Sequence, residues 1–181
     1  MGYKVKYTTA QVNEAMDTTV SRLRNEGVLT SDTVYIVLMN GGTWFASHVF
    51  DRLEEPHNEV YYVKLHSYEG TNSGTIHWDY LPEMDLEGRD IVVLDDICDT
   101  GKTDTAFYQY LQTCRPSSVT FFTLLKRTTT RLPEDIPLYA CIEDNSADFF
   151  VGCGLDDNAH GRLLPYIGIV DAGSSANTCR E

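Results

Sequence analysis

Apolar and polar positions follow two different periods along this chain, and the change of period marks the predicted elements. From Val12 to Leu23 apolar residues recur every three or four positions, which predicts an amphipathic helix. The segment from Thr8 to Gln11 has the form of a capping box, in which a threonine and a glutamine three residues later satisfy each other's backbone N–H groups. Gly27 is placed to end this helix.

Dense apolar runs that are too short for helices predict buried strands. These runs cover Thr33–Met39, Val60–Leu65, Ile91–Leu94, Val119–Leu125, Leu138–Ile142 and Tyr166–Val170. Helical spacing returns between them, from Phe45 to Leu53 and from Ala106 to Leu111. Strands that alternate with helices predict an α/β domain, with a twisted parallel sheet flanked by helices. We expect a single domain over residues 1–181.

Two segments show no such period. Residues 67 to about 84 are polar and irregular, and a loop of this length inside a compact domain is usually functional or disordered. The tail, residues 172–181, is small and polar, and we expect it to be frayed.

Composition narrows the function classes. The formal net charge of −13 argues against a nucleic-acid or anionic membrane partner. No apolar run approaches the roughly 20 residues of a membrane span, and no secretory signal opens the chain, so a cytoplasmic protein is expected. The five cysteines are scattered without a C-x-x-C pair, which indicates free thiols in place of a zinc site or disulfide framework.

The segment from Ile91 to Thr103, here called the signature segment, carries the strongest chemical signal. An apolar run ends in Asp95 and Asp96, Asp99 follows, and a small hydroxyl-rich turn then leads into a predicted helix. Backbone N–H groups at a helix start attract phosphate. Acids beside a phosphate require sugar hydroxyls or a bridging divalent cation. The combination points to a phosphorylated ribose.

This segment resembles the phosphoribosyl-pyrophosphate (PRPP) signature of the type I phosphoribosyltransferases, and the chain best matches their hypoxanthine-guanine branch. The resemblance covers about residues 34–170 and rests on four stretches in order. They are Asn40–Gly42, Ser67–Tyr68, the signature segment, and Lys126 through Phe149 to Arg162. It implies the type I fold with a small hood and a mobile lid loop at about residues 67–84. It also implies a homo-oligomer, either a dimer or a tetramer.

The resemblance implies a PRPP site with Mg²⁺ as cofactor. The residues that it assigns to PRPP are Asp95, Asp96, Thr100, Gly101, Lys102, Thr103, Asn40, Gly41, Gly42, Ser67, Tyr68 and Arg162. Those that it assigns to the metal are Asp95, Asp96 and Asp156. Two positions depart from the family pattern, because Asp95 stands where Glu is common and Asn40 where Lys is frequent.

The resemblance also implies a purine pocket, formed by Lys126, Phe149, Phe150 and Asp156. Lys126 would donate to the carbonyl oxygen of a 6-oxopurine, although Arg127 could take part of that role. Phe149 would stack on the base. The catalytic residue would be Asp99, accepting a proton from the purine nitrogen.

Each of these residues also has a plainer interpretation. Asp99 could be a helix-capping acid, Lys126 a surface cation and Phe150 a core residue. The predicted reaction is Mg²⁺-dependent transfer of phosphoribose from PRPP to hypoxanthine, guanine or xanthine, with release of pyrophosphate. Alternatives are a transferase for another nucleobase, a non-catalytic PRPP or nucleotide sensor, and a phosphoryl-accepting receiver domain.

Overall fold

The computed structural model describes residues 2–53, 57–67 and 76–170. Within these residues the main sheet has six strands in the order β4-β3-β2-β5-β6-β7. Their bounds are β2 Val34–Met39, β3 Val60–Ser67, β4 Ile76–Tyr80, β5 Asp90–Cys98, β6 Ser118–Arg127 and β7 Leu138–Asp144. Neighbours run parallel except β3 and β4, which form an antiparallel pair at one edge.

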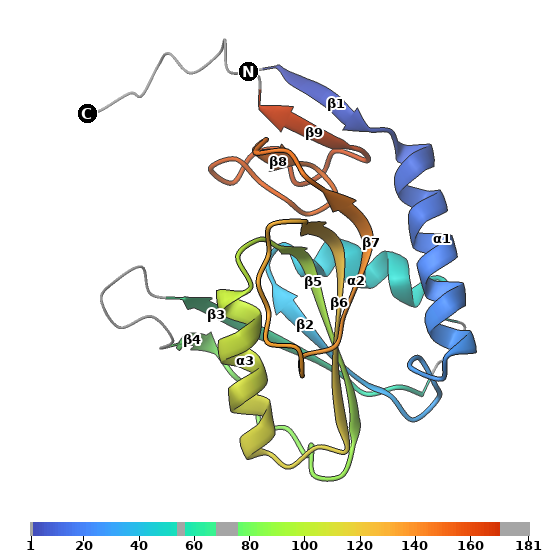
Figure 1. The fold of residues 1–181 in the computed structure, drawn as a ribbon, viewed down its shortest axis with the longest axis vertical. Coiled ribbons are helices and arrows are strands. Elements are labelled where there is room, and N and C mark those ends of the chain that lie inside the picture. The colour runs from blue at the N-terminus through green and yellow to red at the C-terminus, as the bar shows by residue number, and fades with distance from the viewer. Residues whose placement is uncertain (1, 54–56, 68–75, 171–181) are drawn as a thin grey trace.

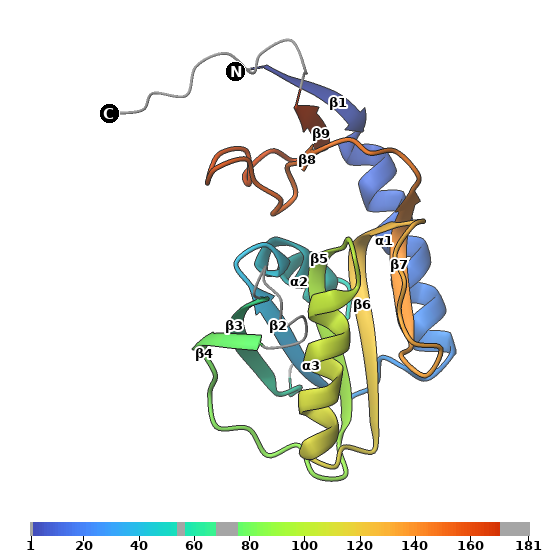
Figure 2. The same cartoon turned by 60° about the vertical axis from the view of Figure 1, so that its left-hand side comes forward.

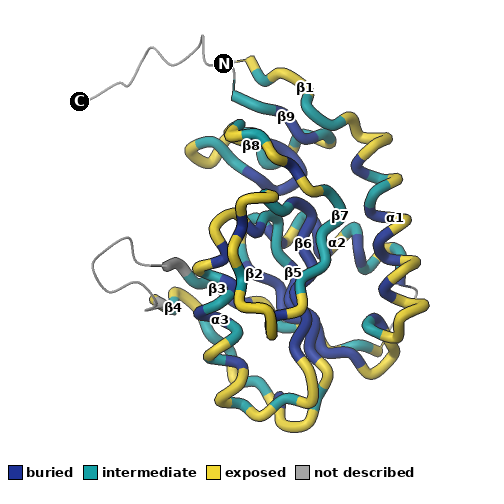
Figure 3. Tube along the Cα trace, viewed as in Figure 1, coloured by how far each residue is buried: buried dark blue, intermediate teal, exposed yellow. Residues whose placement is uncertain are grey.

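Three helices cover the sheet, as Figures 1 and 2 show. Helices α1 (Thr9–Asn25) and α2 (Gly42–Phe50) bury their apolar sides in one cluster with Val37, Leu94 and Phe122. Helix α3 (Lys102–Thr113) packs on the other face through Phe107 and Leu111. The central strands β2, β5 and β6 are therefore buried almost throughout, as Figure 3 shows, which explains their continuous apolar runs.

A second sheet lies beyond the carboxyl edge of the main sheet, and we call it the hood. It has the order β1-β9-β8 and is antiparallel, with β1 at Tyr3–Tyr7, β8 at Phe150–Val151 and β9 at Ile167–Val170. Figure 1 shows it above the carboxyl ends of β5 and β6. The first described strand, β1, thus pairs with the last, β9, and both belong to the hood.

Most predicted elements are confirmed, and the structure adds three strands that were not predicted. The capping box is present, with Thr8 as N-cap and Gln11 bonded back to it. No strand was predicted at β1 or β8. Residues 67–84 were predicted to form one loop, whereas Ile76–Tyr80 forms strand β4, so the sheet is mixed at this edge and not wholly parallel. Residues 68–75 and the tail at 172–181 lie outside the described residues.

None of the described helices has the length and apolar character needed to cross a membrane.

A network of charged side chains ties the hood to the main sheet. The Tyr7 hydroxyl on β1 donates to Asp144 at the end of β7, and the Lys6 ammonium lies 2.8 Å from Asp148. Burial alone would raise the pKa of Asp144, but hydrogen bonds from Ser146 and Tyr7 and the charge of Lys6 lower it to about 2. The ionised carboxylate of Asp144 is therefore favoured by folding, and its stabilisation is present above the ordinary carboxyl pKa near 4.

Replacing Asp144 by Asn should lower the stability at neutral pH and flatten its dependence on acid. The stabilisation of the native protein is lost as pH falls from about 4 to about 2, because the unfolded chain takes up the proton first. We expect Asp144→Asn to cost roughly 1–2 kcal/mol, or about 3–6 °C in melting temperature, at pH 7.

Thermal melts followed by circular dichroism at pH 7 and pH 3 measure this difference, with exposed Asp32→Asn as the matched control. The network would be dispensable if Asp144→Asn and Asp32→Asn melted together at pH 7.

Candidate active site

The described site residues that were predicted lie in segments at the carboxyl edge of the main sheet and in the hood above it, whose positions Figure 1 shows. Strands β2 and β6 both pair with β5 in parallel, so the segments that follow them leave the sheet on the same side. These segments are Asn40–Gly42 after β2, Asp99–Gly101 after β5 and the turn after Arg127. Parallel strands place ligand sites at this edge as a rule.

Gly41 packs directly against Asp96. A Cβ atom added to Gly41 would lie only 1.7 Å from Asp96 Oδ2, so any larger residue would displace the carboxylate. The hood reaches the same point, because a Cβ on Gly154 would lie 2.3 Å from the Gly41 carbonyl oxygen. Gly154 also has a φ of +100°, which favours glycine. Three segments distant in sequence therefore meet at one backbone contact.

Asp95 and Asp96 form an acidic pair at this contact, and both are partly buried. Burial and the charges of Asp96 and Asp104 raise the pKa of Asp95 well above its usual range. Burial likewise raises the pKa of Asp96, although the positive charge of Arg162 opposes the shift. Two adjacent carboxylates that resist ionisation would be stabilised by a cation or by hydroxyl donors.

These residues fit a magnesium ion for which the substrate and water provide most of the ligands. The described residues contain no group of three or more His, Cys, Asp or Glu side chains able to hold a metal by themselves. Magnesium sites on phosphate substrates commonly use only one or two carboxylates. Asp95 and Asp96 supply that number, next to backbone that only glycine permits.

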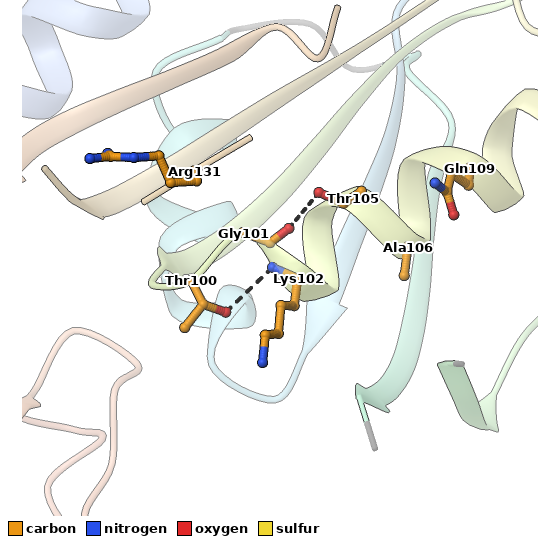
Figure 4. A pocket seen from close by; sticks show the side chains of 7 residues that line it. All are labelled: Thr100, Gly101, Lys102, Thr105, Ala106, Gln109 and Arg131. Atoms are coloured by element: carbon orange, nitrogen blue, oxygen red, sulfur yellow. Dashed lines mark hydrogen bonds between the residues drawn. The ribbon is translucent and has the colours of Figure 1, made fainter. Parts of the chain in front are cut away.

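The turn from Asp99 to Gly101 leads into α3 and leaves the helix start open. Gly101 is the N-cap with a φ of +80°, and it carries no side chain that could cap the first N–H groups. A cavity of about 300 Å³ lies here, bordered by Thr100, Lys102 and Arg131 among others. Figure 4 shows Thr100 and Lys102 pointing to one side of the turn and Arg131 to the other. The Lys102 N–H donates to the Thr100 hydroxyl oxygen at 3.4 Å. A glycine-capped helix start beside a lysine attracts phosphate.

Two residues that the sequence analysis missed hold this turn from behind. The Thr130 hydroxyl donates to the carbonyl oxygens of Cys98 and Asp99. Asp104, in the first turn of α3, is 4% exposed and accepts a hydrogen bond from the Cys98 thiol at 3.1 Å. Burial raises the pKa of Asp104. Its spacing from Phe107 and Leu111 placed it on the buried side of the helix, and that spacing was the available signal.

Asp99 sits at the mouth of the turn with a partner from β6. Arg127 Nε donates to Asp99 Oδ1 at 2.6 Å, while 56% of the Asp99 side chain remains exposed. The same guanidinium donates to the carbonyl oxygens of Ser146 and Asp148, both at 2.7 Å. It also lies over the Phe150 ring, 4.8 Å from the centroid.

Lys126 and the two phenylalanines occupy different surroundings. The Lys126 ammonium lies 3.2 Å from Glu143 on β7. Phe149 is 57% exposed, whereas Phe150 is buried in the cluster that α1 and α2 form with the main sheet. The plainer interpretation of Phe150 as a core residue therefore agrees with its packing, and Phe149 is the ring that is free to stack on a ligand.

Asp156 and Arg162 form a pair within the hood, with Arg162 Nη2 at 2.7 Å from Asp156 Oδ1. Arg162 also donates to the Gly154 carbonyl oxygen, which adjoins Gly41. Asn40 closes a turn by accepting from the Thr43 N–H at 3.4 Å. Ser67 is the last residue of β3, and Tyr68 lies outside the described residues. The structure thus brings Gly41 and Gly42, the Asp95–Asp96 pair and the Gly154–Arg162 part of the hood next to one another.

Comparison with known proteins agrees with this arrangement. Residues 9–158 match the phosphoribosyl transferase domain family. A hypoxanthine-guanine phosphoribosyltransferase of Streptococcus agalactiae is 30% identical over 135 residues, which is 74% of either chain. A hypoxanthine phosphoribosyltransferase of Salmonella typhimurium is 30% identical over 142 residues, covering 77% of this chain and 79% of the relative.

Solved structures share the fold. A hypoxanthine phosphoribosyltransferase from Staphylococcus aureus superposes with a TM-score of 0.83 over 96% of this chain and 94% of its own, at 23% identity. The Trypanosoma cruzi enzyme in complex with the product IMP gives 0.80 over 94% and 95%, at 22% identity. With its type I fold and this match along most of its length, the chain belongs to the phosphoribosyltransferase family, in the group of the hypoxanthine-guanine phosphoribosyltransferases.

Proposed function

We propose that this protein transfers phosphoribose from PRPP to a 6-oxopurine, namely hypoxanthine, guanine or xanthine, with Mg²⁺ as cofactor. The products are the nucleoside monophosphate and pyrophosphate. The observation that carries the proposal is the contact of Asp96 with the backbone at Gly41, on the strand that leads through the Asp99–Gly101 turn to the glycine-capped start of α3. A sugar with a phosphate at each end needs these three features at one edge of the sheet.

The side chains divide the work of binding. The α3 start, with Thr100 and Thr103, receives the 5-phosphate, and Asp95 and Asp96 receive the ribose hydroxyls. Backbone N–H groups at Gly41 and Gly42, together with Arg162, lie where the pyrophosphate group would sit. Asp95, Asp96 and Asp156 are the residues that would hold magnesium, which would supply positive charge for the departing pyrophosphate.

The purine would lie between the hood and the signature segment. Phe149 offers an exposed ring for stacking, and Lys126 offers a donor for the 6-oxo group. Asp99 accepts the proton that leaves the ring nitrogen as the glycosidic bond forms. The bond from the anomeric carbon to pyrophosphate breaks, and catalysis rests on positioning and electrostatics with no covalent enzyme intermediate.

Incubation of the purified protein with PRPP, Mg²⁺ and each nucleobase in turn tests the proposal. We expect pyrophosphate and a nucleoside monophosphate with at least one 6-oxopurine, and neither product when EDTA removes the metal. Formation of product with adenine or uracil alone would contradict the proposed substrate class, and the absence of product with every base would contradict transfer itself.

Asp99→Asn should fold normally and turn over slowly. Its amide cannot accept the purine proton as a base, and a general base contributes about 100-fold or more to turnover. We expect kcat to fall by roughly that factor with little change in the KM for PRPP. Steady-state kinetics with Asp32→Asn as the charge-matched control measure the effect, and an unchanged kcat would remove Asp99 from the mechanism.

Lys126→Met should weaken use of the purine far more than use of PRPP. A lost hydrogen bond from a charged donor costs about 1.5–3 kcal/mol, so the KM for the purine should rise roughly 10- to 100-fold. Glu143→Gln is the matched variant, because it removes the partner of Lys126 and leaves the ammonium in place.

Glu143→Gln should retain purine affinity. If Lys126→Met raised the KM values for PRPP and purine equally, Lys126 would be a structural residue and not a purine ligand.

A further inference from the structure

The Arg127 side chain makes several hydrogen bonds and a cation–π contact near the site. Three of its N–H groups donate, to the Asp99 carboxylate and to the carbonyl oxygens of Ser146 and Asp148, at 2.6–2.7 Å. Its guanidinium plane also covers the Phe150 ring. Only 16% of this side chain is exposed. A side chain so enclosed has little surface left for a ligand.

The partners of Arg127 belong to two sides of the proposed purine pocket. Asp99 lies in the signature segment, which follows β5. Ser146 and Asp148 lie between β7 and β8, in the stretch that leads directly to Phe149. Arg127 itself is the last residue of β6, which separates these two segments in the main sheet. One guanidinium therefore joins Asp99 to the backbone directly before Phe149.

The exposure of the side chains separates Arg127 from the two residues on either side of it. Asp99 and Phe149, the groups that would touch the purine, are each more than half exposed, whereas the arginine between them is not. Arg127 bonds only Oδ1 of Asp99; within the described residues the second oxygen has no hydrogen-bond partner and is left for a purine N–H. The arginine thus fixes the carboxylate without using up its acceptor.

The far side of the same stretch is held independently. The Ser146 hydroxyl and N–H donate to Asp144, and Lys6 pairs with Asp148. These contacts anchor the stretch to the hood and to β7, but they do not reach Asp99. Loss of Arg127 should therefore free the pocket side of the stretch while the hood stays attached.

We propose that Arg127 is a positioning residue for the purine: it sets the placement of Asp99 relative to Phe149 and does not itself contact the base. This inference rests on the proposed function. A lysine could not replace it, because a single ammonium lacks the planar fork that reaches three acceptors in different directions. The role concerns the purine and its proton transfer, and leaves the PRPP contacts at Gly41 and α3 intact.

Kinetics of Arg127→Ala, Arg127→Gln and Arg127→Lys test the inference, with exposed Arg24→Ala as the control for loss of an arginine. We expect kcat/KM for the purine to fall about 10- to 100-fold in all three variants, since small misplacements near a reacting group have effects of this size. The KM for PRPP should change little. Arg127→Lys keeps the charge, so it serves as the second variant should Arg127→Ala fail to fold.

A double-mutant cycle with Asp99→Asn separates positioning from a general structural effect. If Arg127 acts on turnover through Asp99, Arg127→Ala should lower kcat much less in the Asp99→Asn background than in the native enzyme. The rise in purine KM, which acts through the Phe149 side, should persist in both backgrounds.

Three outcomes overturn the inference. They are a folded Arg127→Ala with native kcat and purine KM, equal rises in the KM values for PRPP and purine, and full rescue by Arg127→Lys. A native enzyme that makes no nucleotide from any base would instead overturn the proposed function, and this inference with it. An active native enzyme with unaffected Arg127 variants overturns the inference alone.

Discussion

The structure is organised around the repulsion between two adjacent carboxylates. Asp95 and Asp96 lie near the carboxyl end of the central strand β5, and their surroundings disfavour their charged forms. Without a bound partner, the burial of two adjacent carboxyl groups lowers the stability of the fold. Here the surroundings combine the glycine-capped start of α3, the backbone at Gly41 and Arg162 of the hood, which are the features that the proposed function requires for a phosphorylated sugar. The acidic pair explains why the remaining elements converge on this edge.

The net negative charge of the chain must also be reconciled with a polyanionic substrate. A net charge of −13 would repel a polyanion from most of the surface, so recognition must be local. Helix dipoles and backbone N–H groups provide fixed partial charges that do not alter the net charge at all. Asn40 fits this scheme, because the neighbouring glycine backbone, and not a lysine side chain, makes the close approach to Asp96.

Much of the fold could be predicted from the sequence because its signals were local. The capping box at Thr8 and the apolar runs of the central strands depend only on near neighbours, and the structure confirms them. Strand β4 was missed because a polar, two-stranded edge has no continuous apolar run to mark it. Strand β1 was missed because its partner, β9, is far away in sequence.

The candidate site shows the same limit more sharply. Lys126 and Arg127 are adjacent on one strand, and sequence spacing alone left open which of them would meet the base. Their surroundings differ through residues about 20 positions downstream: Glu143 faces Lys126, while Ser146 and Asp148 engage Arg127. Asp104 was overlooked for a related reason. An acidic residue in the sequence indicates an exposed position, and its burial is understood only once its hydrogen-bond partner Cys98 is known.

Different interactions hold the two halves of the proposed site, and they differ in how many substitutions they tolerate. The sugar and phosphate half depends on backbone contacts at Gly41, Gly101 and Gly154, where almost any side chain would collide with its neighbours. The proposed purine half depends on the Arg127 side chain, which joins Asp99 to the stretch before Phe149 by hydrogen bonds. Substitutions around Arg127 can therefore retune the base pocket without disturbing the acidic pair, whereas the glycines leave no such freedom. A fold divided in this way can keep one sugar donor while changing the acceptor.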